Sequence, residues 1–136
     1  MKNSSKEIAL KWLKQAEFDL KDAKKAFEWQ SYNLCCFLAQ QAVEKALKAL
    51  LYYVGAEEIW GQSAGILLKE ATKYYPELES LLPQAKSLDK YYIPTRYPDA
   101  LPDEIVPSEA YDSSDGESAL SKAERILSKV RSLIIN

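Results

Sequence analysis

YNLCCFLAQQAVEKALKALLYY, residues 32–53, contains neither glycine nor proline and is rich in good helix formers, so it predicts one uninterrupted helix. On a helical wheel its polar side chains form a single strip that covers well under half of the circumference. The strip consists of Asn33, Gln40, Gln41, Glu44, Lys45 and Lys48. Because the rest of the surface is apolar, this segment should pack against neighbours on two sides, as the central helix of a bundle.

The segment before it predicts a helix from Ser4 to about Trp29. Ser4 and Glu7 fit a capping box, and the short break at Gln30 and Ser31 should return the chain as an antiparallel helical hairpin. The apolar residues that recur at helical spacing, and are expected to be buried, are Ile8, Trp12, Ala16, Leu20, Ala23 and Phe27.

Two shorter helical segments should follow the central helix, which Gly55 closes. Ser63 can cap the first of them, and Pro76 should end it. The second should kink or restart at Pro83, which has no N–H to donate. The expected buried stripes are Ile66, Leu67, Ala71 and Tyr74 in the first, and Leu78, Leu81, Leu82, Ala85 and Leu88 in the second.

Residues 93–112, IPTRYPDALPDEIVPSEAYD, hold four of the six prolines and show neither helical nor strand periodicity. A loop of this length is uncommon in a compact domain and is often functional. Its tyrosines and aliphatic residues should dock it on the bundle: Tyr91, Tyr92, Ile93, Tyr97, Ile105, Val106 and Tyr111. Ser114 and Glu117 then suggest a capping box for a last helix with an apolar seam at Leu120, Ala123, Leu127, Val130 and Ile134.

Together these elements predict one all-α domain over residues 1–136, an antiparallel bundle of four to five helices with an ordered loop before the last. No apolar run is long enough to span a bilayer, and the polar N-terminus lacks the features of a signal peptide, so a cytoplasmic location is expected. Cys35 and Cys36 are adjacent on the central helix and should be buried packing groups. We expect no metal site and no cofactor.

The distribution of charge is uneven although the net charge is only −2, a value that argues against broad binding of duplex nucleic acid. Residues 1–48 carry nine Lys against six acidic residues, whereas residues 94–117 carry seven acidic residues and the single Arg96. Two solvated faces explain this pattern, and so does self-association or a charged partner. The chain has no histidine, which excludes Ser-His-Asp and Cys-His catalytic arrangements.

Arg96 lies at the centre of the candidate ligand site, in KYYIPTRYPD, residues 90–99. The two prolines restrain the backbone, a guanidinium suits phosphate or carboxylate, and Tyr92 and Tyr97 offer rings for stacking on a base. Asp99 is a further candidate. The structural alternative is a salt bridge from Arg96 to Asp99, Asp89 or Glu44 that fastens the loop to the bundle.

Gln41, Glu44, Lys45 and Lys48 on the central helix form the second part of the candidate site. Glu44 and Lys48 are a favourable i,i+4 pair, which is also consistent with a simple solvated edge. If the loop folded across this strip, Arg96, Tyr97, Gln41 and Lys45 would line one groove.

Three segments carry a resemblance to a known family: FLAQQAVEKALKALL (37–51), LDKYYIPTRYPDALP (88–102) and SDGESALSKAERIL (114–127). Together they resemble the HEPN family, the higher eukaryote and prokaryote nucleotide-binding domains. The resemblance implies a bundle of four to five helices, a homodimer, and a small nucleotidyltransferase partner in an arrangement similar to a toxin and antitoxin pair.

Many HEPN proteins are metal-independent ribonucleases that use an arginine followed, after four to six residues, by a histidine. Arg96 matches the arginine, but Leu101, Pro102 and Asp103 occupy the histidine positions, and Gln62 stands where some relatives place another histidine. The resemblance therefore implies a non-catalytic homodimer that binds a nucleotide or a nucleotidyltransferase. The alternatives are a ribonuclease in which Tyr97, Asp99 or Asp103 replaces the histidine, and a purely structural helical dimer.

Overall fold

The computed structural model describes the backbone of residues 2–135 and the side-chain surroundings of residues 4–135. Within that range the chain is helical and contains no strand, so the all-α prediction is confirmed. Three long helices form its body: α1 (Lys2–Glu28), α2 (Tyr32–Tyr53) and α6 (Ser113–Ile134). None of the described helices combines the length and the apolar character needed to cross a membrane.

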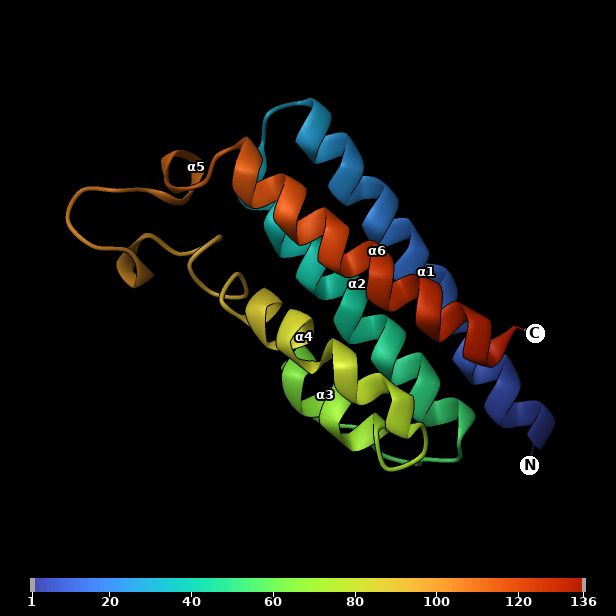
Figure 1. Cartoon of the computed structure of the whole chain (residues 1–136). Helices are drawn as coiled ribbons and strands as arrows, with labels where there is room; N and C mark the ends of the chain where they lie inside the picture. The colour runs from blue at the N-terminus through green and yellow to red at the C-terminus, as the bar shows by residue number, and fades with distance from the viewer. Residues whose placement is uncertain (1, 136) are drawn as a thin grey trace.

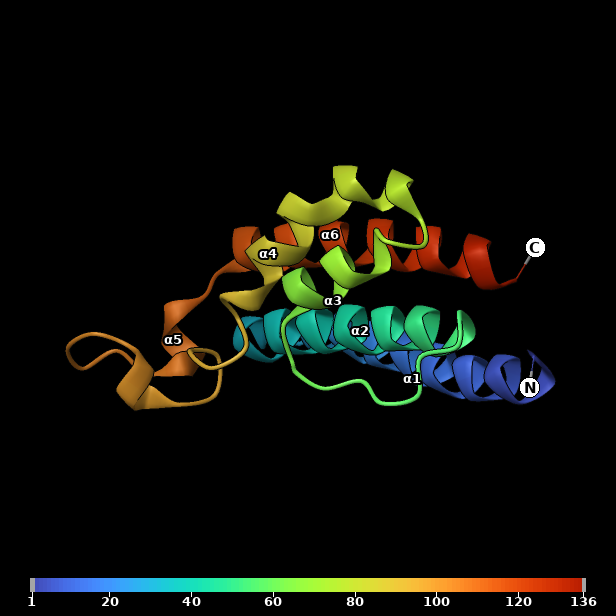
Figure 2. The same cartoon turned by 90° about the horizontal axis from the view of Figure 1, so that it is seen from below.

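The long helices lie side by side, with both chain termini at the same end of the bundle (Figures 1 and 2). α1 and α2 form the predicted antiparallel hairpin, and α6 packs against both of them. A second group of short elements covers another side of α2: α3 (Ala64–Ala71), the 3₁₀ helix η1 (Pro76–Leu81) and α4 (Leu82–Asp89). Figure 2 shows α3 between α2 and α4, so α2 has helices on two sides.

The bounds of α2 match the prediction, and its burial confirms that it is the central helix. Cys35 and Cys36 are fully buried, as expected of small packing groups. Gly55 follows the helix with φ +102°, a left-handed backbone that favours glycine and ends the helix where predicted. The core side chains of α2 are Cys36, Ala39, Ala42, Val43, Ala46, Leu47, Ala49, Leu50 and Leu51.

Two predicted capping boxes are wrong. α1 already begins at Lys2, so Ser4 lies inside the helix and is not its cap. At the start of α6 the cap is Asp112, two residues before Ser114: its side chain accepts from the Asp115 N–H at 3.0 Å, and the Asp115 carboxylate accepts from the Asp112 N–H at 3.0 Å. Asp112 is the residue with extended backbone, which an N-cap needs.

Several predicted core positions are also wrong, because periodicity identifies one face of a helix but not whether a neighbour covers each residue on it. On α1, Ile8 is exposed while its neighbour Ala9 is buried. On α3, Ile66 is exposed, and Tyr74 is exposed beyond the helix end at Ala71. The Ser63 cap of α3 is confirmed, since its side chain accepts from the Ile66 N–H, and a new helix does begin at Leu82, immediately before Pro83.

Residues 93–112 form an arm that projects from the end of the bundle opposite the termini (Figure 1). It contains two short helical turns, η2 (Pro98–Ala100) and α5 (Pro107–Ala110). Its base is closed where Tyr91 meets Tyr111 edge to face, with ring centres 5.8 Å apart. Beyond this base the expected docking fails, since the side chains of four residues are at least one-third exposed: Ile93, Tyr97, Ile105 and Val106.

Candidate functional site

The guanidinium of Arg96 lies against three aromatic rings. Its central carbon is 4.5 Å from the ring centre of Phe37, 4.7 Å from that of Tyr92 and 4.9 Å from that of Tyr97. Each distance is within the range of a cation–π interaction. We call these four side chains the Arg96 cluster. Tyr92 and Tyr97 were predicted to lie beside Arg96, whereas Phe37 comes from α2 and was not.

The backbone of the arm base holds Arg96 in this position. Nε of Arg96 donates to the carbonyl of Tyr92 at 3.0 Å. The neighbouring Thr95 is buried, and its hydroxyl donates to the carbonyl of Tyr91. Nδ2 of Asn33 donates to the Thr95 carbonyl at 3.2 Å, which ties the arm to α2 one turn before Phe37. The cluster is therefore built on fixed backbone at the junction of α2 and the arm.

The salt bridge expected as a structural alternative is not formed. Within the described part of the chain Arg96 has no ion pair, and its one hydrogen bond uses Nε. The terminal N–H groups of the guanidinium point to no acceptor among residues 4–135, and the side chain is exposed. Aromatic rings stabilise the positive charge without neutralising it, so these donors are available to a phosphate or carboxylate.

Asp99 lies on η2 near this cluster but takes no part in it. Its side chain is exposed and makes no hydrogen bond or ion pair in the described range. Asp103, farther along the arm, is exposed and has a left-handed backbone with φ +55°. The structure thus groups Arg96, Tyr92 and Tyr97, and leaves both aspartates apart from them.

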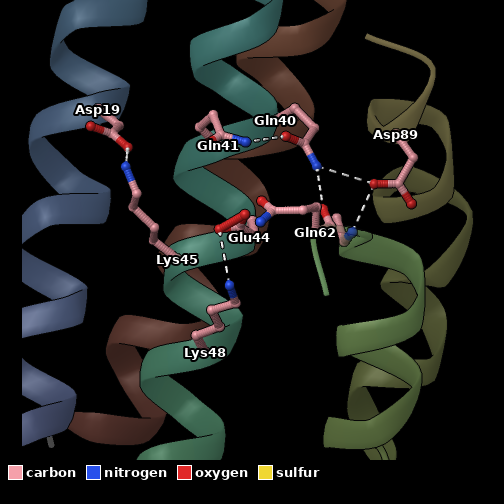
Figure 3. Close-up of polar contacts among 9 residues, drawn as sticks. Asp19, Gln40, Gln41, Glu44, Lys45, Lys48, Gln62 and Asp89 are labelled. Atoms are coloured by element: carbon pink, nitrogen blue, oxygen red, sulfur yellow. Dashed lines mark hydrogen bonds and ion pairs between the residues drawn. The ribbon is translucent and has the colours of Figure 1, made fainter. Parts of the chain in front are cut away.

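Most side chains of the polar strip of α2 form hydrogen bonds or ion pairs with other residues of the chain (Figure 3). Nζ of Lys45 lies 2.5 Å from Oδ2 of Asp19 on α1. Gln41 donates from Nε2 to Oε1 of Gln40 at 2.8 Å. Lys48 is buried, and its Nζ lies 3.5 Å from Oε2 of Glu44. The Lys45–Asp19 pair joins α2 to α1, and the other two contacts lie within α2, so the strip is not a simple solvated edge.

Glu44 has a buried side-chain oxygen without a hydrogen-bond partner among the described residues. This oxygen is Oε1, and the side chain as a whole is only 3% exposed. Burial raises the pKa of this carboxyl, and the nearby charge of Lys48 opposes that increase. A buried acid paired on one oxygen only is a costly arrangement in a core.

Asp89 connects α2, α3 and α4 through one carboxylate (Figure 3). Oδ1 accepts from the Ala64 N–H at 2.7 Å, and Oδ2 accepts from the Gly65 N–H at 3.0 Å, so the carboxylate caps the start of α3. Gln40 on α2 donates from Nε2 to Oδ1 of Asp89 at 3.2 Å and to the Gln62 carbonyl at 2.8 Å. Gln62 therefore contributes through its backbone.

Arg96, Tyr97, Gln41 and Lys45 make no hydrogen bond or ion pair with one another in the described structure. Lys45 instead borders an open groove of about 380 Å³ between α1 and α2, together with Lys11, Trp12 and Gln15. The predicted site residues thus separate into the exposed Arg96 cluster and an internal network below the surface of α2. The signal that could have identified Phe37 is its position in the central helix, one turn before Gln41 on the polar side.

Comparison with known proteins relates the whole arrangement to one family. Residues 9–133 match the model of the HEPN domain. A protein of Methanocaldococcus jannaschii named "Putative toxin MJ1304" is 29% identical over 130 residues, which cover 90% of this chain and 86% of that protein.

Solved structures agree with this match. TT1696 from Thermus thermophilus is 41% identical, with a TM-score of 0.85 over 91% of this chain and 96% of its own. ST0689, described as an archaeal HEPN homologue, is 40% identical, with a TM-score of 0.76 over 93% and 97%. A HEPN domain protein from Thermotoga maritima is 34% identical, with a TM-score of 0.71 over 90% and 95%.

Proposed function

The chain belongs to the HEPN domain family, and we therefore propose that it is a non-catalytic, homodimeric member of a toxin–antitoxin-like system. In this proposal the Arg96 cluster binds a nucleotide, a nucleotidyltransferase partner that presents one, or both. The similarity to a protein named as a toxin supports the toxin–antitoxin part. The chemistry of the cluster supports the ligand part.

The observation that carries the proposal is a guanidinium held by three rings and left without an anionic partner. Its terminal N–H donors can form two parallel hydrogen bonds to a phosphate, which a lysine ammonium cannot do with the same geometry. The half-exposed ring of Tyr97 lies beside these donors and offers a surface on which a base can stack. A phosphate with an attached base matches both features.

We propose a non-catalytic protein because the chain lacks the proton-transfer group that HEPN ribonucleases use. The positions where HEPN ribonucleases place a histidine hold Leu101, Pro102 and Asp103, and the whole chain has no histidine. Leucine and proline cannot transfer a proton. Asp103 is an exposed carboxylate on the arm, separate from the Arg96 cluster.

Affinity capture from the native host tests the partner part of the proposal. Tagged wild type should retain a nucleotidyltransferase, and Arg96→Gln should retain much less of it. Asp99→Asn is the matched control, since it changes a neighbouring exposed side chain outside the cluster. Equal capture by wild type and Arg96→Gln would show that the cluster is not the docking site.

A further inference from the structure

The outer surface of α1 carries a basic stripe with an aromatic centre. Lys11, Lys14, Phe18, Lys21 and Lys25 follow one another at steps of three and four, which places them within a sector of about 80° on the helix. Phe18 is 49% exposed, and Nζ of Lys21 lies 5.9 Å from its ring centre. Beside them is an open hollow of about 240 Å³, lined by Lys14, Glu17, Phe18 and Lys21. We call this surface the α1 stripe.

The charges of the stripe are not used within the chain. Other lysines of the same region have acidic partners: Lys24 pairs with Glu124, and Lys45 pairs with Asp19. The four stripe lysines form no ion pair with any residue whose side chain the structure describes. Glu17, which shares the hollow, is already paired with Arg131 at 2.9 Å. The stripe therefore presents free positive charge around an exposed ring.

The arm carries charge of the opposite sign to that of the α1 stripe. Its exposed acidic residues make no ion pair in the described range: Asp99, Asp103, Glu104 and Glu109. Between them lie Ile105 and Val106, which are 40% and 38% exposed. Aliphatic side chains flanked by carboxylates match an aromatic ring flanked by lysines.

The two surfaces do not meet within one molecule. The arm projects away from the bundle (Figures 1 and 2), and its short helix α5 packs against α2. The closed base at Tyr91 and Tyr111 fixes the direction of the arm. We propose that the arm of one copy docks on the α1 stripe of a second copy, with Ile105 and Val106 at the Phe18 hollow.

This inference rests on the homodimer in the proposed function and specifies its interface. In a twofold pair the same contact forms twice, so two arms and two stripes bury their exposed apolar side chains together. The net charge of −2 favours this acidic segment over nucleic acid as the occupant of the stripe. Opposite charges on the two surfaces should also make the association sensitive to salt.

A charge-swap experiment tests the interface. The stripe variant carries Lys14→Glu and Lys21→Glu, and the arm variant carries Glu104→Lys and Glu109→Lys. By light scattering after gel filtration, wild type should have twice the chain mass of 15.4 kDa, and each variant alone should have the single mass. An equimolar mixture of both variants should recover the double mass, because each reversed surface then meets an opposite charge. Lys69→Glu with Lys73→Glu, on and just beyond α3, is the control and should remain dimeric.

The other outcomes separate this inference from the proposed function. If either variant alone were dimeric, or if the mixture stayed monomeric, the proposed interface would be wrong, whereas the proposed homodimer would not be contradicted. A wild type that is monomeric at all concentrations would overturn both. If the stripe variant stayed dimeric but lost binding to single-stranded RNA, the stripe would belong to a nucleic acid and the docking proposal would be wrong.

Discussion

The guanidinium carbon of Arg96 lies 4.5 Å from the ring centre of Phe37, which joins the arm to the central helix. The contact places the positive charge of Arg96 against an aromatic ring, which holds the guanidinium in position and leaves it charged. An ion pair would have held the arm equally well but would have consumed the anion-binding capacity of the guanidinium. The difference between these two arrangements is the basis of the proposed function.

The first prediction concerns RNA cleavage. Without histidine, wild type and Arg96→Ala should release fragments from a labelled single-stranded RNA at the same background rate, because no side chain near Arg96 is suited to proton transfer near neutral pH. Gel analysis of time courses measures both rates. A wild-type rate clearly above that of Arg96→Ala would instead support the ribonuclease alternative.

Asp89→Asn should destabilise the fold by about 2 kcal/mol, since hydrogen bonds to a charged group at a helix start are among the stronger ones. The amide keeps the shape of the side chain but places an N–H donor against the donors of Ala64 or Gly65. Urea denaturation measures the loss. Asp99→Asn has no such contacts and should change stability by no more than about 0.5 kcal/mol. Equal effects of the two changes would argue against the cap.

Glu44→Gln should alter how stability depends on pH. Burial raises the pKa of Glu44 in the folded state above its unfolded value of 4.5, so the folded protein binds the proton more tightly. The contribution of Glu44 to the free energy of unfolding therefore falls as the pH rises from about the unfolded pKa through the folded one. Glutamine does not titrate, so Glu44→Gln should gain stability relative to wild type as the pH rises from 4.5 towards neutrality.

Denaturant titrations of both proteins at several pH values check this prediction. Glu79→Gln, a change at an exposed site on η1, is the reference. A difference in the free energy of unfolding between wild type and Glu44→Gln that stayed constant across the pH range would contradict this prediction.

The two thiols should be unreactive in the folded protein. Burial raises the pKa of Cys35 to about 11 and that of Cys36 to about 12, so almost no thiolate is present near neutral pH. A thiol-specific disulfide reagent should label neither residue in native protein and both after denaturation in guanidinium. Rapid labelling of either cysteine in native protein would mean that this part of α2 opens readily.

The fold could be predicted largely from local signals. The α2 segment has no helix breaker, so its bounds were predicted correctly. Gly55 and Ser63 have no alternative capping residue beside them, so the end of α2 and the start of α3 were also predicted correctly. The capping box predicted at Ser114 was wrong because Asp112, two residues earlier, has the extended backbone of an N-cap and forms reciprocal hydrogen bonds with Asp115. The predicted burial of Ile66 was wrong because periodicity identifies a face of a helix but not whether a neighbour covers that face.

The candidate site was predictable only within one segment of chain. Tyr92, Arg96 and Tyr97 are neighbours in sequence, so their grouping followed from spacing. The contribution of Phe37 depends on how the arm base meets α2, and the internal pairing of Lys45 depends on how α1 meets α2. Such contacts are set by tertiary packing, which spacing does not encode.

A thermal-shift measurement of wild type and Arg96→Gln with ATP, other nucleotides and short RNA tests directly whether the Arg96 cluster binds a phosphate-bearing ligand. A ligand that binds only the folded state raises its stability by RT ln(1 + [L]/Kd), which is about 2.7 kcal/mol at a hundredfold excess over Kd. We expect a rise in melting temperature for wild type with a phosphate-bearing ligand, and no rise for Arg96→Gln above its own ligand-free melting temperature. An equal rise in both proteins, or no rise in wild type with any of these ligands, would contradict the proposed function.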